Sequence, residues 1–465
     1  MSAPTLWIAV PFLTGLFILF FLREKLAGWI GGATSAVLSL TALFIPIDEA
    51  LLLGAVSFKI SPSVQVFGRS FQLNPEDAPL LVFIYGLAAL WFFGTEASGT
   101  ANRFASLGLM IVALLTASIA VQPFLYAALL LVMAAMLVVP MLLPPYQRAG
   151  RGVVRFLIYH VIAMPFILFS GWMLAGVEAS PGDLGSTLQA GTMLGLGFAF
   201  LFAVFPLYNW IPMLMEEAHP YATGFLLWAL PTFTVIFAFG FLDRYLWLRT
   251  SPQISTAIQA AGILMVASAG IFAALQRHLG RILGYAAIGE AGLLLLLMGI
   301  DTPYMVELSF LFLAARGLQL TVWALALSII KQKAYSLRFS EVQGLARQYP
   351  VAAGALIIAH LSTMGFPLLA GFPPRLALWQ ELAGESLTAS FWTFFGMVCL
   401  LIAAVRSLAV FVMTDDESPW RLNESWVQIA MLGLGVIGLF ILGMLPQAIQ
   451  PFTAGLPAMF EQLGQ

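Results

Sequence analysis

The sequence predicts an all-α polytopic membrane protein of about fourteen transmembrane helices, and its composition and hydropathy support that prediction. Of the 465 residues, 61% are hydrophobic and 9% are charged, whereas a soluble domain is nearer half apolar and a quarter charged. The mean hydropathy is +0.96. At ~20 apolar residues per crossing, this chain has enough for about fourteen helices. The composition excludes a soluble enzyme and a disordered chain, and 20 basic against 22 acidic residues leave no basic surface for nucleic acid.

Uninterrupted apolar runs place the individual spans. The first run is preceded by no charge and followed directly by Arg23-Glu24-Lys25, so we expect a retained helix rather than a cleavable signal peptide. The twelfth run is too long for one straight crossing and contains several prolines, so we expect it to be broken. The runs lie at about 5–22, 27–47, 79–95, 104–122, 124–143, 153–176, 190–211, 222–247, 254–275, 281–300, 304–330, 350–380, 389–414 and 427–447.

The distribution of basic residues predicts that both termini lie on the outer face. Loops after odd-numbered spans contain about thirteen Lys and Arg residues, and loops after even-numbered spans contain about four. The richer side is the cytoplasmic one, and an even number of spans agrees with termini on one side. Between the second and third spans, residues 55–75 alternate apolar and polar residues with Pro and Gly at candidate turns, which predicts a short β-hairpin on the outer surface.

The single cysteine, Cys399, limits the chemistry that this chain can hold. One thiol excludes a disulfide framework, a thiolate zinc site and an iron–sulfur cluster bound by this chain alone. We therefore expect neither a metal nor a redox centre on the chain, and no catalytic residue.

Two spans are interrupted by proline at corresponding places, which predicts an internal repeat. Both contain Phe-Pro-Leu, at 205–207 in span 7 and at 366–368 in span 12. If the units are spans 4–8 and 9–13, each broken span is the fourth member of its unit, and an odd number of spans makes the units inverted. Taken singly, such prolines merely kink a helix; the matched positions favour functional breaks. The prolines concerned are Pro206 and Pro212 in span 7, and Pro367, Pro373 and Pro374 in span 12.

Ionisable side chains at bilayer depth gather in the second unit. They are Glu290 in span 10, Arg316 with Gln319 on one face of span 11, His360 and Arg375 in span 12, and Arg406 in span 13. Such groups cost several kcal/mol in a membrane and are functional candidates. They could form a proton path in which Glu290 or His360 titrates, because arginine does not release its proton. The alternative is a structural ion-pair network in which one arginine neutralises Glu290. Both interpretations remain open.

The first unit, by contrast, is nearly empty of charge. Span 5 contains no charged residue, and span 7 contains none before Glu216. His160 and His278 are more simply satisfied polar residues than ligands. The segment GLGVIG at 433–438 fits a dinucleotide-binding pattern, but it lies inside span 14 with no strand before it, so close helix packing by small residues explains it better.

Three stretches of the chain resemble motifs of a known family. The first, LGRILGYAAIGEAGLLLLLMG (279–299), is similar to N-x-K-R-L-L-A-Y-S-S-I-x-H-x-G. The second and third, FPLYNWIPMLMEEAHPYATG (205–224) and GFPLLAGFPPRLALW (365–379), are similar to P-F-H-x-W-L-P-D-A-x-x-x-A-P-T-P-V-S and G-x-P-P-x-x-G-F-x-x-K. These mark the antiporter-like membrane subunits of respiratory complex I (NADH:quinone oxidoreductase), membrane hydrogenases and Mrp antiporters. Span count and motif order agree over essentially the whole chain.

The resemblance implies a single antiporter-like domain over 1–465. It would consist of N-terminal helices with the outer hairpin (1–103), a first repeat (104–250), a second repeat (251–415) and a C-terminal helix (416–465). It also implies that other membrane-arm subunits are the partners, that flavin, iron–sulfur clusters and quinone belong to partner subunits, and that the chain lies in a bacterial cytoplasmic membrane. The family's role is proton translocation driven by a neighbouring quinone-reducing arm.

Several of the family's charged positions are altered in this sequence. The family's glutamate in span 5 and lysines in spans 7 and 8 fall on apolar or neutral residues: Leu131, Leu201, and Pro231 or Thr232. The span 10 histidine falls on Glu290, the span 11 lysine on Gln319 and the span 12 lysine on Arg375, while Glu216 matches an acid sometimes found after the span 7 break. We therefore expect a membrane-arm subunit with a degenerate first half-channel. The alternatives are a stand-alone secondary ion/proton antiporter, which the few buried carboxylates disfavour, and a purely structural membrane subunit.

Overall fold

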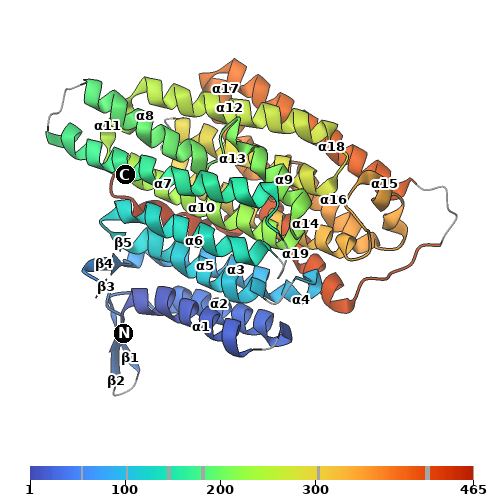
Figure 1. Cartoon of the computed structure of the whole chain (residues 1–465), viewed down its shortest axis with the longest axis horizontal. Coiled ribbons are helices and arrows are strands. Elements are labelled where there is room, and N and C mark those ends of the chain that lie inside the picture. Colours follow the sequence, from blue (N-terminus) through green and yellow to red (C-terminus); the bar gives the residue numbers. More distant parts are fainter. Residues whose placement is uncertain are drawn as a thin grey trace.

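The computed structural model describes residues 1–22, 24–53, 56–100, 103–143, 148–179, 184–300, 304–413 and 419–463. Its α-helices run roughly alongside one another, with the N-terminal pair at one edge of the bundle (Figure 1). The N-terminal part consists of a π-helical turn η1 (Thr5–Ala9), α1 (Val10–Phe21), α2 (Glu24–Phe44), β1 (Ala50–Leu53), β2 (Val56–Lys59), β3 (Ser63–Val66), β4 (Arg69–Gln72), η2 (Pro75–Asp77), α3 (Ala78–Phe93) and α4 (Thr95–Ser98).

The remaining elements form the two units and the C-terminal part. The first unit comprises α5 (Arg103–Ala120), β5 (Val121–Gln122), η3 (Phe124–Tyr126), α6 (Ala127–Leu142), α7 (Arg151–Ala179), α8 (Leu184–Leu201), η4 (Leu207–Asn209), α9 (Trp210–Glu217), α10 (Pro220–Arg244) and α11 (Leu246–Thr250). The second comprises α12 (Pro252–Leu275), α13 (Leu279–Gly299), α14 (Met305–Lys331), α15 (Phe339–Val342), η5 (Leu345–Arg347), α16 (Pro350–Thr363), α17 (Phe372–Glu385) and α18 (Leu387–Val412). The chain ends with α19 (Trp426–Met444), η6 (Pro446–Ala448), α20 (Gln450–Thr453) and η7 (Leu456–Met459).

The predicted fold class is confirmed. Within the described residues, 11 helices are long and apolar enough to cross a membrane, and three shorter apolar helices, Thr5–Phe21, Thr187–Leu201 and Pro350–Thr363, account for the other predicted spans. Two of the short helices are the first halves of the spans predicted to be broken. The chain is therefore an integral membrane protein. Both termini lie at the same end of the bundle (Figure 1), as an even number of crossings requires.

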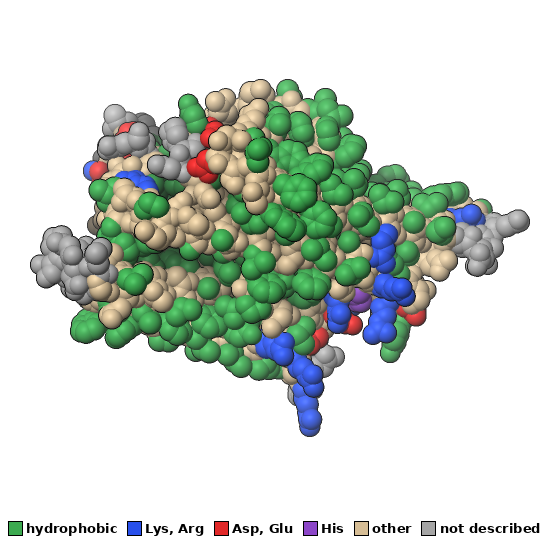
Figure 2. Space-filling view, turned by 90° about the horizontal axis from the view of Figure 1, so that it is seen from above, with side chains coloured by type: hydrophobic (Ala, Val, Ile, Leu, Met, Phe, Trp, Pro, Cys, Tyr) green, Lys and Arg blue, Asp and Glu red, His purple; other side chains and the backbone are tan. Residues whose placement is uncertain are grey.

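The surface agrees with that arrangement. Hydrophobic side chains cover most of the face in Figure 2, and most of its Lys and Arg side chains gather in the half away from the termini. Cationic side chains are excluded from hydrocarbon, so they collect where the helices leave it.

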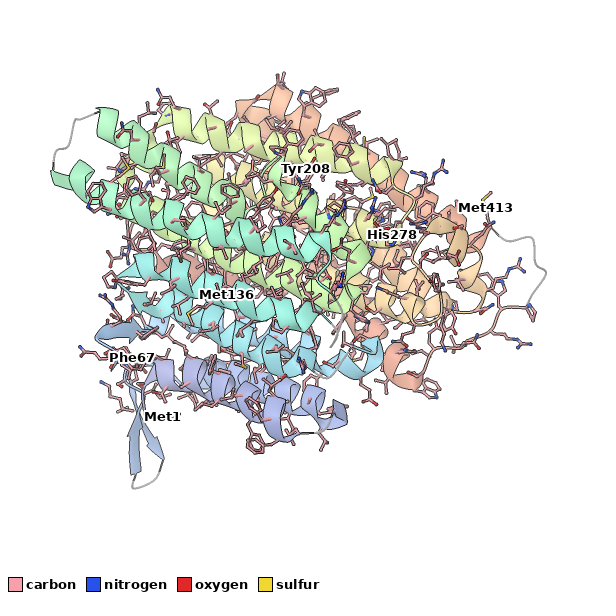
Figure 3. The ribbon with its side chains drawn as sticks, in the orientation of Figure 1. Met1, Phe67, Met136, Tyr208, His278 and Met413 are labelled. Carbon is pink, nitrogen blue, oxygen red and sulfur yellow. The ribbon has the colours of Figure 1, made fainter. Side chains whose placement is uncertain are left out.

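Two β-hairpins lie at the end of the bundle that holds the termini, where the sequence predicted one over 55–75. β1 pairs with β2, and β3 pairs with β4 and continues to β5, all antiparallel. The β3–β4 hairpin falls within the predicted segment. It turns through Phe67 and Gly68, both with positive φ (+50° and +73°), which is the geometry that matches strand twist in a two-residue turn. Phe67 is fully exposed at its tip (Figure 3). The first hairpin was missed because it begins at Ala50, before the predicted segment. Residue 55, where the predicted segment begins, lies outside the described residues.

The two predicted breaks are present. α8 ends at Leu201, Ala203 takes a positive φ of +52°, and the chain passes Pro206 and the short turn η4 before α9 begins. α16 ends at Thr363, Gly365 and Leu368 take positive φ of +81° and +72°, and Pro367 lies between them. Pro206 and Pro367 thus lie inside the breaks. The other three prolines, Pro212, Pro373 and Pro374, lie in the first turn of the helix that follows, where the missing N–H costs nothing.

The helix contacts repeat between the two units. α9, which follows the first break, contacts α7 and α10; α17, which follows the second break, contacts α14 and α18. In each unit the segment after the break thus packs on the third and fifth members, as an inverted repeat of spans 4–8 and 9–13 requires. α10 also packs on α14 and joins the units. The segment boundaries 104–250 and 251–415 remain a prediction.

Burial differs strongly between helices. α5, α10, α13 and α14 are almost wholly enclosed by other helices, whereas α19 is buried over only 11% of its span. Gly435 and Gly438 let α19 approach α14, because a Cβ on either glycine would lie 2.4 Å from Val322 or 2.9 Å from Leu318. Close helix packing is therefore what the 433–438 segment does. The charged residues of α13 and α14 lie on the most enclosed helices of the fold.

Candidate functional site

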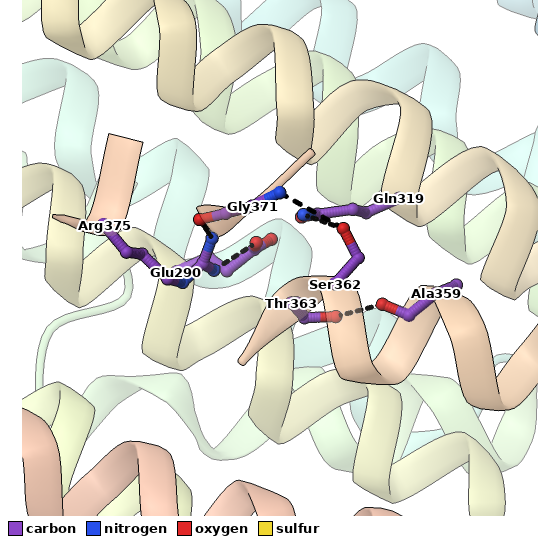
Figure 4. A network of polar contacts seen from close by, with 7 residues as sticks. All are labelled: Glu290, Gln319, Ala359, Ser362, Thr363, Gly371 and Arg375. Atoms are coloured by element: carbon purple, nitrogen blue, oxygen red, sulfur yellow. Dashed lines mark hydrogen bonds and ion pairs between the residues drawn. The ribbon is translucent and has the colours of Figure 1, made fainter. Parts of the chain in front are cut away.

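A buried ion pair joins span 10 to the second half of broken span 12. Arg375 Nη2 lies 2.9 Å from Glu290 Oε1, and the two side chains are 3% and 4% exposed. Arg375 stands in the first turn of α17, and its Nη1 donates to the Gly371 carbonyl at 3.0 Å (Figure 4). The break in span 12 therefore supplies both the position of the guanidinium and one of its acceptors. A charge-assisted bond of this kind is stronger than a neutral one.

The Ser362 hydroxyl connects the same break to span 11. Ser362 Oγ accepts from Gln319 Nε2 at 2.8 Å and from the Gly371 backbone N–H at 3.2 Å (Figure 4). Gly371 has no room for a side chain, because a Cβ there would lie 1.9 Å from the Ser362 carbonyl oxygen and 2.6 Å from both Arg375 Nη1 and Gln319 Nε2. Helices α14, α16 and α17 thus meet at Gly371 through Gln319, Ser362 and Arg375.

Arg316 reaches from the second unit to the first. Its Nη2 donates to the Leu227 carbonyl of α10 at 2.9 Å, while its Nε and Nη1 have no hydrogen-bond partner among the described residues. The charges of Glu290 and Arg375 act on it electrostatically. Arg316, Arg375 and Glu290 therefore form one charged group at bilayer depth.

His360 lies on span 12 but makes no hydrogen bond to this group. Its ring is fully buried and stacks on Trp323, with centroids 4.4 Å apart and planes at 28°. Neither ring nitrogen has a well-formed partner in the described part of the chain, and the backbone of Leu400 lies beside it. The structure brings together Glu290, Arg316, Gln319 and Arg375, and leaves His360 beside them.

Arg406 and Glu216 lie apart from the buried group. Arg406 is half-buried, donates to the Ala274 carbonyl in the last turn of α12 and covers the Phe339 ring, which is the position of a cation that caps a helix C-terminus. Glu216, at the end of α9, pairs with Arg281 and, at 3.7 Å, with Arg338. These two residues join helix ends rather than helix centres.

The other two histidines that the sequence singled out are satisfied polar residues, as expected. His160 Nδ1 lies 2.8 Å from the Phe156 carbonyl. His278 precedes α13 and accepts from the Arg281 backbone N–H. Burial lowers the pKa of His278 to about 4, although the negative charge of Glu216 acts to raise that pKa. His278 lies in the short connection between α12 and α13 (Figure 3).

The first unit places neutral residues at the altered family positions. Leu131, Leu201 and Thr232 are 2%, 6% and 0% exposed. Thr232 donates its hydroxyl to the Trp228 carbonyl within α10. One turn before Thr232 on α10, Trp228 stacks on Trp91 with ring centroids 6.3 Å apart. Nothing at these three positions in the described structure carries a charge.

Several polar residues that fix the site or the ends of the fold were not anticipated. Ser362 and Gly371 were hidden because their role depends on the backbone path through the break; the only signal was Ser-Thr-Met directly before Gly-Phe-Pro. Glu424 is buried and accepts from the N–H groups of Val351 and Ala352 at 2.9 and 3.1 Å, so it caps α16 from a distant loop. Asp243 accepts from the backbone N–H groups of residues 461–463.

A cavity lies outside the charged group. It has a volume of about 340 Å³ and lies between the start of α14, the end of α17 and residues 446–453. Its lining includes Glu307 and Glu381 but neither member of the buried pair. Across the described residues, no group of three or more His, Cys, Asp or Glu side chains is placed to hold a metal ion.

Two broken helices at matched places, one of them carrying a buried charged group, define an antiporter-like integral membrane protein. Residues 177–403 match the family model described as "NADH:quinone oxidoreductase/Mrp antiporter, TM". This match confirms the predicted resemblance to the antiporter-like membrane subunits.

Individual relatives extend the similarity along the chain. The chain is 26% identical over 443 residues to NADH-quinone oxidoreductase subunit 14 of Thermus thermophilus, covering 90% of this chain and 97% of that one. It is 26% identical over 340 residues to NADH-quinone oxidoreductase subunit N of Parafrankia sp., covering 66% of this chain and 63% of that relative. The fold matches a chain of respiratory complex I from Thermus thermophilus with a TM-score of 0.80 at 19% identity, over 99% of this chain and 100% of that one.

Proposed function

We propose that the chain is a membrane-arm subunit of a complex I-like, redox-driven proton pump, with a degenerate first half-channel. The observation that carries the proposal is the contrast between the units. The second holds Glu290, Arg316 and Arg375 at bilayer depth, whereas the first holds Leu131, Leu201 and Thr232 where the family resemblance places a glutamate and two lysines. A path without ionisable steps does not load a proton.

The remaining proposals follow from the family. Flavin, iron–sulfur clusters and quinone would belong to partner subunits, and the chain would contact other membrane-arm subunits through its lipid-facing helices. The basic half of the surface would face the cytoplasm of a bacterium and both termini the outside, by the positive-inside rule. The proton path, if the second half conducts, would use Glu290 and His360 as its titrating groups, with Gln319 and the arginines setting the potential around them.

A purely structural subunit is the second candidate, and one observation favours it. Glu290 is held by Arg375 at 2.9 Å, and Arg375 in turn by Gly371. Because arginine keeps its proton, this pair pins α13 to α17 without any step that transfers one. A stand-alone ion/proton antiporter has less support, since a sodium site needs several oxygen ligands.

Isolation from the native membrane tests the class of function. After gentle solubilisation, we expect the chain to copurify with subunits that carry flavin and iron–sulfur clusters, detected by absorbance and electron paramagnetic resonance. A chain that purifies alone and transports ions in vesicles contradicts the proposal.

The Glu290→Gln variant separates the pump from the scaffold. If the second half conducts, this variant lowers the proton-to-electron ratio of the assembled complex in vesicles, while Glu341→Gln, an exposed acid on α15, leaves it unchanged. Normal assembly with an unchanged ratio in both variants leaves the structural role. The water structure is an independent readout: we expect ordered water near Glu290, His360 and Arg375, and continuous water along α6, α8 and α10 contradicts the degenerate first half-channel.

A further inference from the structure

The buried charged group carries more positive than negative charge. Arg316 and Arg375 are 2% and 3% exposed and cannot neutralise themselves, because a guanidinium keeps its proton in a protein. Glu290 is the carboxylate that acts on both of them; within the described residues no second carboxylate does. His360 adds no negative charge in either protonation state. Two cations therefore share one anion at bilayer depth.

The hydrogen-bonding groups around this excess charge are mostly donors. Arg316 Nε and Nη1, Arg375 Nε and Trp228 Nε1 are buried and have no partner in the described chain. Trp228 adjoins Leu227, whose carbonyl binds Arg316, and its Nε1 would lie 3.1 Å from a Cβ on Gly317, the residue after Arg316. The unpartnered acceptors of the same group are Glu290 Oε2 and Gln319 Oε1. Four donors face two acceptors.

An uncompensated charge in a bilayer is strongly unfavourable, and the usual escape by losing a proton is closed to arginine. The Phe312 ring, 5.5 Å from the Arg375 guanidinium carbon, covers one face of that cation but supplies no counter-charge. What balances a surplus of one positive charge among N–H donors is an anion.

We propose that a small inorganic anion, of which chloride is the probe, binds beside Arg316 as the counter-ion of this group, held by the free N–H groups of Arg316, Arg375 and Trp228. Both guanidinium groups are enclosed by helices, which favours a small free anion over a phosphate or carboxylate attached to a lipid or a peptide. The anion would bridge α10, α14 and α17, and so join the two units across the break in span 12. The inference goes beyond the proposed function and does not depend on redox partners.

Chloride dependence of stability tests the site. The full-length chain in lipid nanodiscs is unfolded by heat in sodium chloride and in sodium gluconate at equal ionic strength, and followed by tryptophan fluorescence. A ligand that binds only the folded state raises the unfolding temperature once its concentration exceeds its Kd, and the rise then continues with the logarithm of the concentration. We expect such a rise with chloride and not with gluconate. Equal unfolding temperatures in the two salts overturn the proposal.

Three variants locate the effect. Arg316→Gln removes the surplus charge and abolishes the difference between the salts, whereas the matched variant Arg406→Gln, in an arginine outside the group, keeps it. Glu290→Gln removes the competing negative charge and lowers the chloride concentration at which the unfolding temperature begins to rise, at least about tenfold. An unchanged onset concentration in Glu290→Gln contradicts the site even if Arg316→Gln fails to fold.

Bromide gives a direct view of the same site. In crystals grown in sodium bromide, we expect an anomalous scattering peak beside the Arg316 and Arg375 guanidinium groups. Peaks confined to the exposed basic loops contradict the proposal. Redox activity or its absence bears on neither experiment, so failure of the anion site and failure of the proposed function remain distinguishable.

Discussion

The buried pair of Glu290 and Arg375 makes a quantitative prediction about stability. At 2.9 Å and an effective dielectric constant of 20, the two charges attract by about 6 kcal/mol before the cost of desolvating them. Removing one member leaves the other buried without its partner, which typically costs ~3–5 kcal/mol. We therefore expect Glu290→Gln and Arg375→Met each to lower the free energy of unfolding by about that amount.

The double variant distinguishes lost pairing from lost packing. Replacing both members of a buried pair is often nearly neutral, so Glu290→Gln with Arg375→Met should recover most of the loss, less ~1–2 kcal/mol for the bond from Arg375 to the Gly371 carbonyl. Unfolding by sodium dodecyl sulfate in mixed micelles, followed by tryptophan fluorescence, measures all four proteins of the cycle. Additive losses refute a coupled pair. A Glu290→Gln variant as stable as the parent also refutes it, and indicates a protonated carboxyl that the amide replaces without cost.

Three further predictions concern the break, the C-terminus and pH. Gly371→Ala places a Cβ 1.9 Å from a carbonyl oxygen and should cost more than about 3 kcal/mol in the same unfolding assay, whereas Gly354→Ala, with no atom within 4 Å, should stabilise α16 by up to ~1 kcal/mol. Asp243→Ala removes the acceptor of three backbone N–H groups and should speed carboxypeptidase digestion of residues 461–463 several-fold; an unchanged rate means that the carboxylate does not hold this end. His278 has its pKa lowered to about 4, so the unfolded state takes up its proton first and stability falls as pH drops from ~6.5 toward 4, by at most about 3 kcal/mol. His278→Asn, which keeps a helix-capping acceptor, should flatten that dependence, and an equally steep fall in the variant assigns it to other groups.

Much of the fold was predictable because the hydrocarbon core of a bilayer permits few backbone structures. Backbone groups in a bilayer must be satisfied within a helix, so apolar length alone locates most spans. The breaks were predictable from the matched Phe-Pro-Leu positions of Pro206 and Pro367, since a single proline does not suffice: Pro231 lies inside the continuous helix α10. A positive φ at Gly365 completes the second break. The β1–β2 hairpin was not, because its first strand, Ala50–Leu53, lies between the second predicted span and the alternating segment at 55–75.

The charged residues of the candidate site were predictable from the sequence, but their hydrogen-bond partners were not. Burial cost singles out Glu290, Arg316 and Arg375 from sequence, since charged residues are rare at such depth. Their partners are largely backbone: the carbonyls of Leu227 and Gly371, which no side-chain pattern identifies. Arg406 illustrates the opposite error. It lies in an apolar run by composition, yet a long side chain near a helix end reaches the carbonyl that terminates the neighbouring helix.

The two units differ in how they satisfy the same electrostatic constraint. A lone charge is costly at bilayer depth, so charged positions are stable only when they are lost together or kept together. At the positions where the family resemblance places a glutamate and lysines, the first unit has the buried neutral residues Leu131, Leu201 and Thr232. The second unit is charged, but with the carboxylate of Glu290 and two arginines, Arg316 and Arg375, that cannot give up a proton. An arginine such as Arg375 at a position where a lysine is expected keeps the positive charge but removes the proton that a lysine could transfer. In the proposed path, titration at Glu290 would work against the hold of Arg375, and a bound anion beside Arg316 would lower the positive potential that opposes protonation there. On the two proposals together, the pair and its counter-ion would set whether Glu290 takes part in conduction or only holds its helices in place.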